Sequence, residues 1–319
     1  MSSLFAQIRS AAARVAQDAR FVHLDEDRIA PYAASLSLQG LPVTVYDTEH
    51  HFHGNDAETA AYLLTLDSVN FGSGYFPHLR KRAGMSGYFT VASSLTDHWQ
   101  HHGPLTPAQL SVMTPANCAA IFGQSLDDPA VVELMGLFAH ALRDLGEWLR
   151  SFDDDSLAPI AASGGSAERL IEHLTAMPLY RDVARFRGYE VPLYKRAQLL
   201  VADLALAFGQ QGPGAFEDLD DLTMFADNLV PHVLRVDGLL RYDPALLAHI
   251  NDGQLILAGS PEETEIRAVG LHVVERVAEE LRAQGTQVTA RELDYLFWHR
   301  GQAPHYKAQP RHRTRSVFY

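Results

Sequence analysis

Apolar side chains recur at helical spacing through most of this 319-residue chain. Residues 4–18 and 58–66 carry them every three or four positions, which predicts two amphipathic helices. The same spacing extends over 129–152, 192–208 and 261–281 and predicts three longer helices. The buried face expected for the helix over 129–152 consists of Val132, Met135, Phe138, Ala139, Leu142, Leu145 and Leu149. These patterns predict a mainly α protein with little or no sheet.

Local signals mark where several elements begin or break. Thr106 followed by Pro107 predicts a capped helix start, and Thr289 with Glu292 forms a capping-box pattern. Residues 29–41 favour a short helix followed by a loop, and β-branched residues 43–46 favour an extended segment. Ser163-Gly164-Gly165-Ser166 is a candidate hinge, although we treat residues 1–319 as a single unit.

Composition narrows the class of partner and compartment. The net charge of -13 argues against binding duplex nucleic acid, because phosphate binding needs a basic face. The single cysteine, Cys118, excludes an internal disulfide and fits a reducing compartment, and we expect it to be buried rather than nucleophilic. The first 20 residues lack a continuous apolar stretch, and no apolar run reaches membrane-spanning length. We therefore expect a cytoplasmic protein without a signal peptide.

Two acidic residues follow or interrupt apolar segments. Asp227 ends the run 222–226 and stands just ahead of Pro231, which can occupy the first turn of a helix. An N-capping Asp is the simpler interpretation of that segment by itself, since Asp is a favoured cap. Asp294 lies within an apolar helix, so it must be paired. An ion pair with Arg267 and hydrogen bonds from a ligand are equally good explanations.

Other residues could contact a ligand. Lys195 and Arg196 begin a helix, where the dipole disfavours cations, so an anion nearby would explain them; solvated side chains are the default alternative. Asn70 and Phe71 stand in a glycine-flanked loop that could present an amide and a ring to a flat heterocycle. Phe225 could supply a second ring.

Histidines are concentrated in two places. The group His50, His51 and His53 has neither HExxH nor zinc-finger spacing, so a metal site is less favoured than one histidine stacking on or hydrogen-bonding a ligand. The second group, residues 98–102, is expected in a polar surface loop. The basic stretch 307–315 is interpreted as a solvated or docked tail more readily than as a binding patch. Walker, GxGxxG and GxSxG motifs are absent, which disfavours phosphoryl transfer, dinucleotide binding and serine hydrolysis.

Taken together, five segments resemble the queuosine salvage protein family, the queuosine 5'-phosphate N-glycosylases. They are residues 66–71, 186–199, 222–234, 265–268 and 293–295. The resemblance extends from about His50 to Tyr319. The chain departs from the family pattern at Gly72-Ser73-Gly74, where an aromatic is expected, and at Asn228 and His232, where Tyr and Gln are expected. None of these changes affects Asp227.

The resemblance implies a helical, DNA-glycosylase-like fold and hydrolysis of queuosine 5'-monophosphate to release queuine. Asp227 falls at the position of the family's catalytic aspartate, where it would stabilise an oxocarbenium ion, orient water or attack the sugar. Phe225 with His51 or His50 would hold the base, and Asp294 would accept hydrogen bonds from its N–H groups or amine arm. Lys195, together with Arg196 or without it, would contact the 5'-phosphate.

The resemblance implies no metal and no organic cofactor. The expected partner is a free nucleotide, with no stable nucleic-acid complex and no membrane. Two other hypotheses remain at this point. One is a non-catalytic binder of a modified nucleobase or nucleotide, and the other is a metal hydrolase built on His50, His51 and His53.

Overall fold

The computed structural model describes residues 2–36 and 45–319. The end of the segment 29–41, and residues 43 and 44 of the predicted extended segment, lie outside the described residues. The chain forms two compact units. Unit 1 comprises Met1–Thr44, Asp182–Lys195 and Asp220–Arg315, and unit 2 comprises Val45–Arg181, Arg196–Leu219 and Ser316–Tyr319. The candidate hinge at 163–166 lies inside unit 2, and action as a single functional unit stays a prediction.

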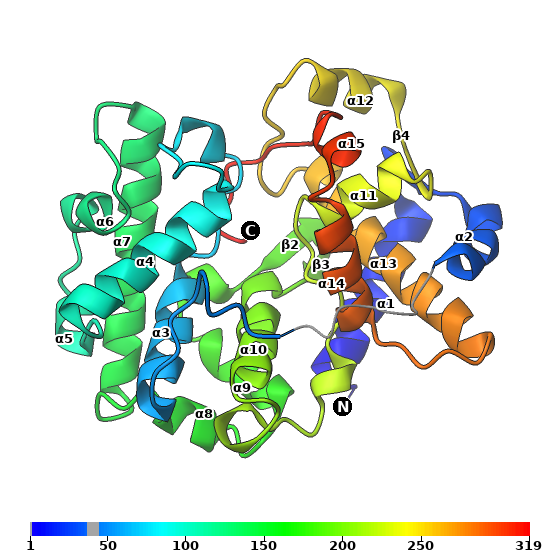
Figure 1. Ribbon diagram of the computed structural model, residues 1–319. Helices are drawn as coiled ribbons and strands as arrows, with labels where there is room; N and C mark the ends of the chain where they lie inside the picture. Colours follow the sequence, from blue (N-terminus) through cyan, green and yellow to red (C-terminus); the bar gives the residue numbers. More distant parts are fainter. Residues whose placement is uncertain (1, 37–44) are drawn as a thin grey trace. The chain divides into compact units, whose positions relative to one another are not determined.

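Unit 1 is built around one long helix, α13. Its helices are α1 (Leu4–Asp18), η1 (Glu26–Arg28), α2 (Ile29–Ser35), α11 (Val230–Val236), α12 (Pro244–Asn251), α13 (Pro261–Ala283), α14 (Ala290–Arg300) and α15 (Pro304–Lys307). Figure 1 shows α13 beside α1 and α2, the two helices it contacts most extensively. Ser260 caps α13 and Pro261 occupies its first turn, and the helix covers the predicted range 261–281. Both apolar and charged side chains of α13 are buried, so this helix forms the core of unit 1.

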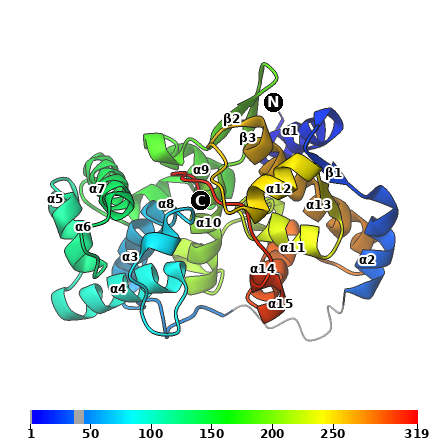
Figure 2. The ribbon, with the colours of Figure 1, turned by 90° about the horizontal axis from the view of Figure 1, so that it is seen from above.

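Two short antiparallel ladders complete unit 1. Strand β1 (Val22–Leu24) pairs with β4 (Leu240–Tyr242), and β2 (Val183–Phe186) pairs with β3 (Tyr189–Pro192). Figure 2 shows the turn between β2 and β3. Arg187 and Gly188 form that turn with φ values of 47° and 87°, which is the left-handed geometry that a tight hairpin requires. Glycine adopts this geometry without strain.

Unit 2 is a helical assembly around α7. Its helices are α3 (Asp56–Ser68), η2 (Phe76–His78), α4 (Gly87–His102), α5 (Pro107–Leu110), α6 (Pro115–Ile121), α7 (Pro129–Arg150), α8 (Ala158–Ala162), α9 (Ala167–Leu174), η3 (Pro178–Tyr180) and η4 (Gly212–Gly214). Helix α10 (Lys195–Ala207) and η5 (Leu219–Asp221) continue from one unit into the other. Figure 2 shows α5 and α6 beside α7, and α3 packs on α7 as well.

The prediction of a mainly α protein with little sheet is confirmed. Helix α1 begins and ends where the pattern predicts, and the capping box at Thr289 makes both of its hydrogen bonds. Three details of the prediction are wrong. Val132 is 41% exposed, because the buried face of α7 is rotated towards Val131 and Leu134. The segment 192–208 becomes helical only at Lys195, because Pro192 pairs in β3. The second histidine group, residues 98–102, lies on α4 rather than in a loop.

The cysteine prediction is also confirmed. Cys118 is buried, and burial raises the pKa of its thiol to about 12, so the reactive thiolate is disfavoured. Within the described ranges, no helix combines the length and the apolar character needed to cross a lipid bilayer.

Candidate functional site

The segment that carries Asp227 has no regular secondary structure. Residues 222–227 belong to neither a helix nor a strand, yet Leu222, Thr223, Met224, Phe225 and Ala226 are all buried. Buried backbone groups must find hydrogen-bond partners, and here side chains supply them. The N–H of Phe225 donates to Asp294 Oδ1 at 3.0 Å, and Ala226 O accepts from Arg267 Nε at 2.8 Å. Side chains from α13 and α14 therefore fix the residues that precede Asp227.

Asp227 itself is held by the chain that follows it. Its Oδ1 accepts the N–H of Leu229 at 2.8 Å and the N–H of Val230 at 3.1 Å. Helix α11 begins at Val230 with Pro231 in its first turn, and its N-cap is Leu229, so the prediction that Asp227 is the capping residue is wrong. Asp227 lies two residues before the cap and binds the backbone where the helix begins. The side chain is only half-buried, and both of these bonds fall on the same oxygen. One carboxylate thus has a fixed orientation and retains some exposure.

Asp294 is buried beside Asp227. Its exposed fraction is 4%, which confirms that the carboxyl on α14 points into the protein. Burial and then the negative charge of Asp227 raise the pKa of Asp294 well above its usual range, while the N–H of Phe225 and the charge of Lys195 oppose that shift. Arg267, considered as its ion-pair partner, instead contacts Asp182 at 2.6 Å. The charges of Asp227 and Lys195 therefore both act on the carboxyl of Asp294.

Lys195 completes this cluster in unit 1. It is the first residue of α10, is only 7% exposed, and donates its backbone N–H to Asp182 Oδ2 at 3.0 Å. A solvated side chain, the default expectation for Lys195, is therefore not what the structure shows. A buried ammonium needs negative groups nearby, and the carboxyl of Asp294 is one of them.

Arg196 belongs to unit 2, and its guanidinium donates hydrogen bonds to backbone carbonyl groups. Its Nη1 donates to Asp67 O at 3.2 Å and to Ser68 O at 2.7 Å, at the end of α3, and its Nη2 donates to Leu179 O. The guanidinium carbon lies 4.8 Å from the ring centroid of Phe71 and 4.6 Å from that of Tyr180. These contacts give Arg196 a structural role in joining α3 to η3.

Asn70 and Phe71 follow α3 in unit 2. Asn70 donates its side-chain N–H to Asp67 Oδ1 at 3.0 Å. The ring of Phe71 is 1% exposed and meets the edge of Phe138 at a centroid distance of 5.2 Å. Phe71 thus packs in the core of unit 2, and contact of either residue with substrate stays a prediction.

His50 and His51 lie close to aromatic rings in unit 2. His51 Nδ1 is 2.9 Å from Asp47 O, a carbonyl that can only accept, so Nδ1 carries the proton. Its Nε2 then accepts from the hydroxyl of Tyr88 at 2.8 Å. Burial lowers the pKa of His51, which favours this neutral form. His50 packs against Phe89 with ring centroids 4.5 Å apart and bonds Asp47 through Nδ1 at 2.8 Å.

Metal-ligating atoms converge in one place among the residues that the structure covers. Ligand atoms of Asp47, Glu49 and His50 lie within 4.8 Å of one another. Among these residues, the three-histidine set that includes His51 and His53 forms no such group. His50 Nδ1 already bonds Asp47 within the cluster, so its geometry is also that of an ordinary surface turn.

Comparison with known proteins decides the family. The family described as queuosine salvage protein matches residues 50–319. A protein of Sphaerobacter thermophilus named queuosine 5'-phosphate N-glycosylase/hydrolase is 39% identical over 312 residues, covering 96% of this chain and 95% of that protein. The chain belongs to the queuosine salvage protein family. Proteins with the same name from Dictyostelium discoideum and Mus musculus are 32% and 30% identical, covering 82% and 98% of this chain and 78% and 98% of their own lengths.

Two residues that differ from the expected family pattern contact the C-terminal part of the chain, one in the basic stretch and one on α15. Asn228 donates its side-chain N–H to His312 O at 3.3 Å, and His232 Nε2 donates to Tyr306 O at 2.9 Å. His312 is 2% exposed, so the stretch is docked in unit 1, as one of the two interpretations of it predicted. A queuosine salvage protein of this sequence therefore holds its C-terminal segment through an amide and an imidazole.

Arg311 is a cation near Asp227 that the sequence pattern did not single out. Its side chain reaches solvent, yet desolvation by the surrounding protein lowers its pKa, and the charge of Asp227 opposes this shift. The sequence shows only that the stretch 307–315 as a whole is basic. Because the approach of Arg311 to Asp227 depends on how the tail docks, local sequence gives no signal for it.

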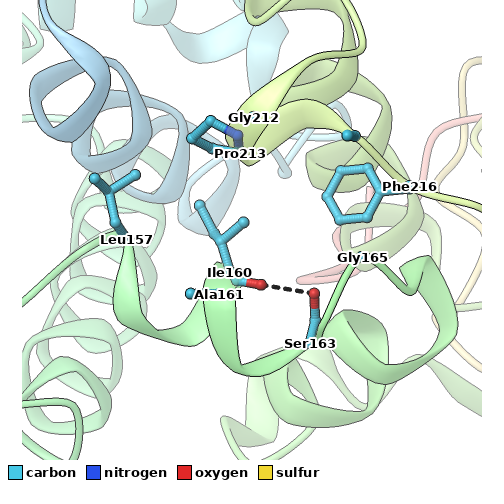
Figure 3. Close-up of a pocket in the computed structure, with 9 residues that line it drawn as sticks. Leu157, Ile160, Ala161, Ser163, Gly165, Gly212, Pro213 and Phe216 are labelled. Carbon is cyan, nitrogen blue, oxygen red and sulfur yellow. Dashed lines mark hydrogen bonds between the residues drawn. The ribbon is translucent and has the colours of Figure 1, made fainter.

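A cavity in unit 2 contains none of the predicted site residues. It has a volume of about 320 Å³ and lies between α8 and residues 212–216, which include η4. Figure 3 shows Leu157, Ile160, Pro213 and Phe216 around it, with the hydroxyl of Ser163 donating to Ile160 O at 2.7 Å. Charged side chains are absent from its lining. The cavity is therefore separate from the predicted site residues.

Proposed function

We propose that this chain hydrolyses the N-glycosidic bond of queuosine 5'-monophosphate and releases queuine. One observation supports this proposal most: Asp227 is oriented by two N–H groups, and buried Asp294 bonds the N–H of Phe225, two residues before Asp227, where the charges of Asp227 and Lys195 both act on it. The names of the relatives give the substrate class. The net charge of -13 favours a free nucleotide over a nucleic-acid chain as substrate, and the buried thiol fits a cytoplasmic setting.

Asp227 acts on the sugar in this proposal. As the base departs, positive charge builds up on the ribose, and a fixed carboxylate stabilises that charge better than mobile water does. The two bonds at Oδ1 restrict the orientation of the carboxylate before substrate arrives. Electrostatic stabilisation, positioning of the attacking water and covalent attack all use this same side chain.

Asp294 recognises the base or its amine arm. Its carboxyl is buried and receives one backbone N–H, so its charged form has few donors around it. N–H groups of the ligand would stabilise that charge and offset the cost of burial. Phe225, whose N–H binds Asp294, meets the ring of Tyr295 edge-on at 6.1 Å and would offer an aromatic face to the base.

Lys195 recognises the 5'-phosphate. Its buried ammonium can form a charge-assisted hydrogen bond that selects the monophosphate over the nucleoside. The contacts proposed for His50, His51, Asn70 and Phe71 remain predictions that substitution of each residue can test. The reaction as proposed uses no metal and no organic cofactor.

The test is release of queuine from queuosine 5'-monophosphate, measured by mass spectrometry. Wild type should give many turnovers, and Asp227→Asn should give almost none. Asp221→Asn is the matched control, because Asp221 is an exposed acid at the end of η5, immediately before the segment that carries Asp227. Stoichiometric binding of the nucleotide without any release of queuine would instead establish the non-catalytic binder. Activity that disappears on exhaustive chelation, and returns with a metal, would revive the metal hydrolase.

A further inference from the structure

The guanidinium of Arg267 forms hydrogen bonds in two directions inside unit 1. Its Nε donates to Ala226 O at 2.8 Å, and its Nη1 and Nη2 donate to the two oxygens of Asp182 at 3.0 and 2.6 Å. Arg267 is 1% exposed and Asp182 is 2% exposed. The planar fork of a guanidinium fits a carboxylate in this bidentate manner, so the relative position of the two residues is narrowly defined.

Asp182 extends this network to Lys195. Its Oδ2 accepts the N–H of Lys195 at 3.0 Å, and its carbonyl accepts the N–H of Leu193 at 2.9 Å and that of Tyr194 at 3.2 Å. Tyr194 has a φ of 47°, which is uncommon for an aromatic residue. Such a backbone persists only where the surrounding contacts enforce it. The start of α10 is therefore set by Asp182.

The other end of the network reaches the segment with Asp227. Ala226 stands between Phe225 and Asp227, and no helix or strand fixes the backbone there. The bond from Arg267 Nε to Ala226 O therefore helps to define where the next residue, Asp227, projects. One guanidinium thus connects the backbone at Asp227 with the backbone at Lys195.

We infer that Arg267 and Asp182 are positioning residues that set the spacing between Asp227 and Lys195. The inference rests on the proposed function, in which these two side chains contact the ribose and the 5'-phosphate. The distance between the anomeric carbon and the phosphate is limited by the covalent structure of the nucleotide. If the spacing between Asp227 and Lys195 is rigid, binding of the phosphate at Lys195 also places the glycosidic bond beside Asp227. This placement raises kcat as well as affinity.

The test is a double-mutant cycle with Arg267→Lys and Lys195→Ala, measured as kcat and KM for queuosine 5'-monophosphate. Arg267→Lys keeps the charge but removes the fork, and displacement of about 1 Å should lower kcat by roughly 10²-fold. If Arg267 acts through Lys195, the double variant should lose little more than the more damaged single variant. Effects that multiply to within about twofold would overturn the inference.

The controls separate positioning from stability. Glu275→Gln breaks a different ion pair on the same helix, because Glu275 is buried on α13 and lies 3.1 Å from Arg9. It should lower the melting temperature while leaving kcat within about twofold of wild type, whereas an equal fall in kcat for both variants would contradict the inference. Asp182→Asn keeps the shape of the carboxylate and serves as the second variant if Arg267→Lys does not fold.

The inference and the proposed function can fail separately. If wild type releases no queuine, the proposed hydrolysis is refuted. The same cycle is then measured as the Kd for queuosine 5'-monophosphate. Non-additive losses of affinity would still support a role in spacing, and additive losses or absence of binding would refute it.

Discussion

Acid should destabilise this protein partly through His232, which lies five residues after Asp227. The imidazole is 3% exposed. Its Nε2 is 2.9 Å from Tyr306 O and must donate, so Nδ1 is the acceptor for Arg235 Nη2 at 3.2 Å. A protonated ring would have to give up that acceptor and place a second positive charge beside Arg235. Burial is the largest cause that lowers the pKa of His232 from 6.5 to about 4.

The size of the effect follows from this difference in pKa. Because the native state keeps His232 neutral, the unfolded state binds more protons below pH 6.5. The contribution to stability is complete above 6.5, falls as the pH drops, and reaches its limit near the native value of about 4. Between about pH 7.5 and about pH 5, linkage gives a loss of about 2 kcal/mol of unfolding free energy from this single group.

The substitution His232→Gln should remove the loss of unfolding free energy that His232 causes at low pH. Glutamine, the residue expected from the family resemblance, donates to Tyr306 O without titrating, and Arg235 keeps its bond to Pro310 O at 2.9 Å. Unfolding free energies from urea titrations, followed by circular dichroism at both pH values, give the difference directly. The expected result is a variant whose loss between the two pH values is smaller than that of wild type by about 2 kcal/mol.

Exposed His101 on α4 provides the control for that experiment. His101→Gln removes one histidine outside the buried cluster, so it should leave the wild-type pH dependence unchanged. Equal pH dependence of wild type and His232→Gln would refute the reasoning, since the neutral buried ring would then not be the source of the acid sensitivity. Buried His312, whose pKa is lowered to about 3 mainly by burial, should leave residual sensitivity in both proteins.

Three further substitutions test the proposed site. Asp227→Asn should lower kcat by about 10³-fold or more while folding and much of the affinity for the base persist, and a rate like that of wild type would refute the assignment. Lys195→Ala should reduce the preference for monophosphate over nucleoside by about 10- to 100-fold, which is the value of a charge-assisted hydrogen bond. An unchanged ratio of kcat/KM for the two substrates would remove the phosphate role. Asp294→Ala should weaken queuine binding by about tenfold or more in calorimetric titration, and an unaltered Kd would leave Asp294 a structural acid.

The elements best predicted from the sequence are those whose signals are local. Helix α1 and the start of α14 follow from apolar periodicity and from capping residues a few positions away. The start of α10 was predicted three residues too early, because Pro192 is taken up by pairing with Val183 in the hairpin. The helical pattern of residues 192–208 gives no sign that Pro192 pairs with another strand, β2.

The same distinction applies to the candidate site, where residues defined by local sequence could be predicted and residues defined by distant contacts could not. Asp227 ahead of a helix and a buried Asp294 could be predicted, because each is defined by its neighbours along the chain. Asp182 could not, since its role comes from contacts with Lys195 and, 85 residues away, with Arg267. The partner first considered for Asp294 was Arg267, which is in fact occupied by Asp182. Choosing among buried charges requires distances that sequence spacing does not supply.

The departures from the family pattern at Asn228 and His232 bear on Asp227 indirectly. Both follow Asp227 along the chain. Asn228 bonds His312 O in the basic C-terminal stretch, and His232 bonds Tyr306 O on α15, just before that stretch. That stretch also holds Arg311, whose charge interacts with Asp227. Substitution at either position should therefore act on Asp227 through the placement of a nearby cation.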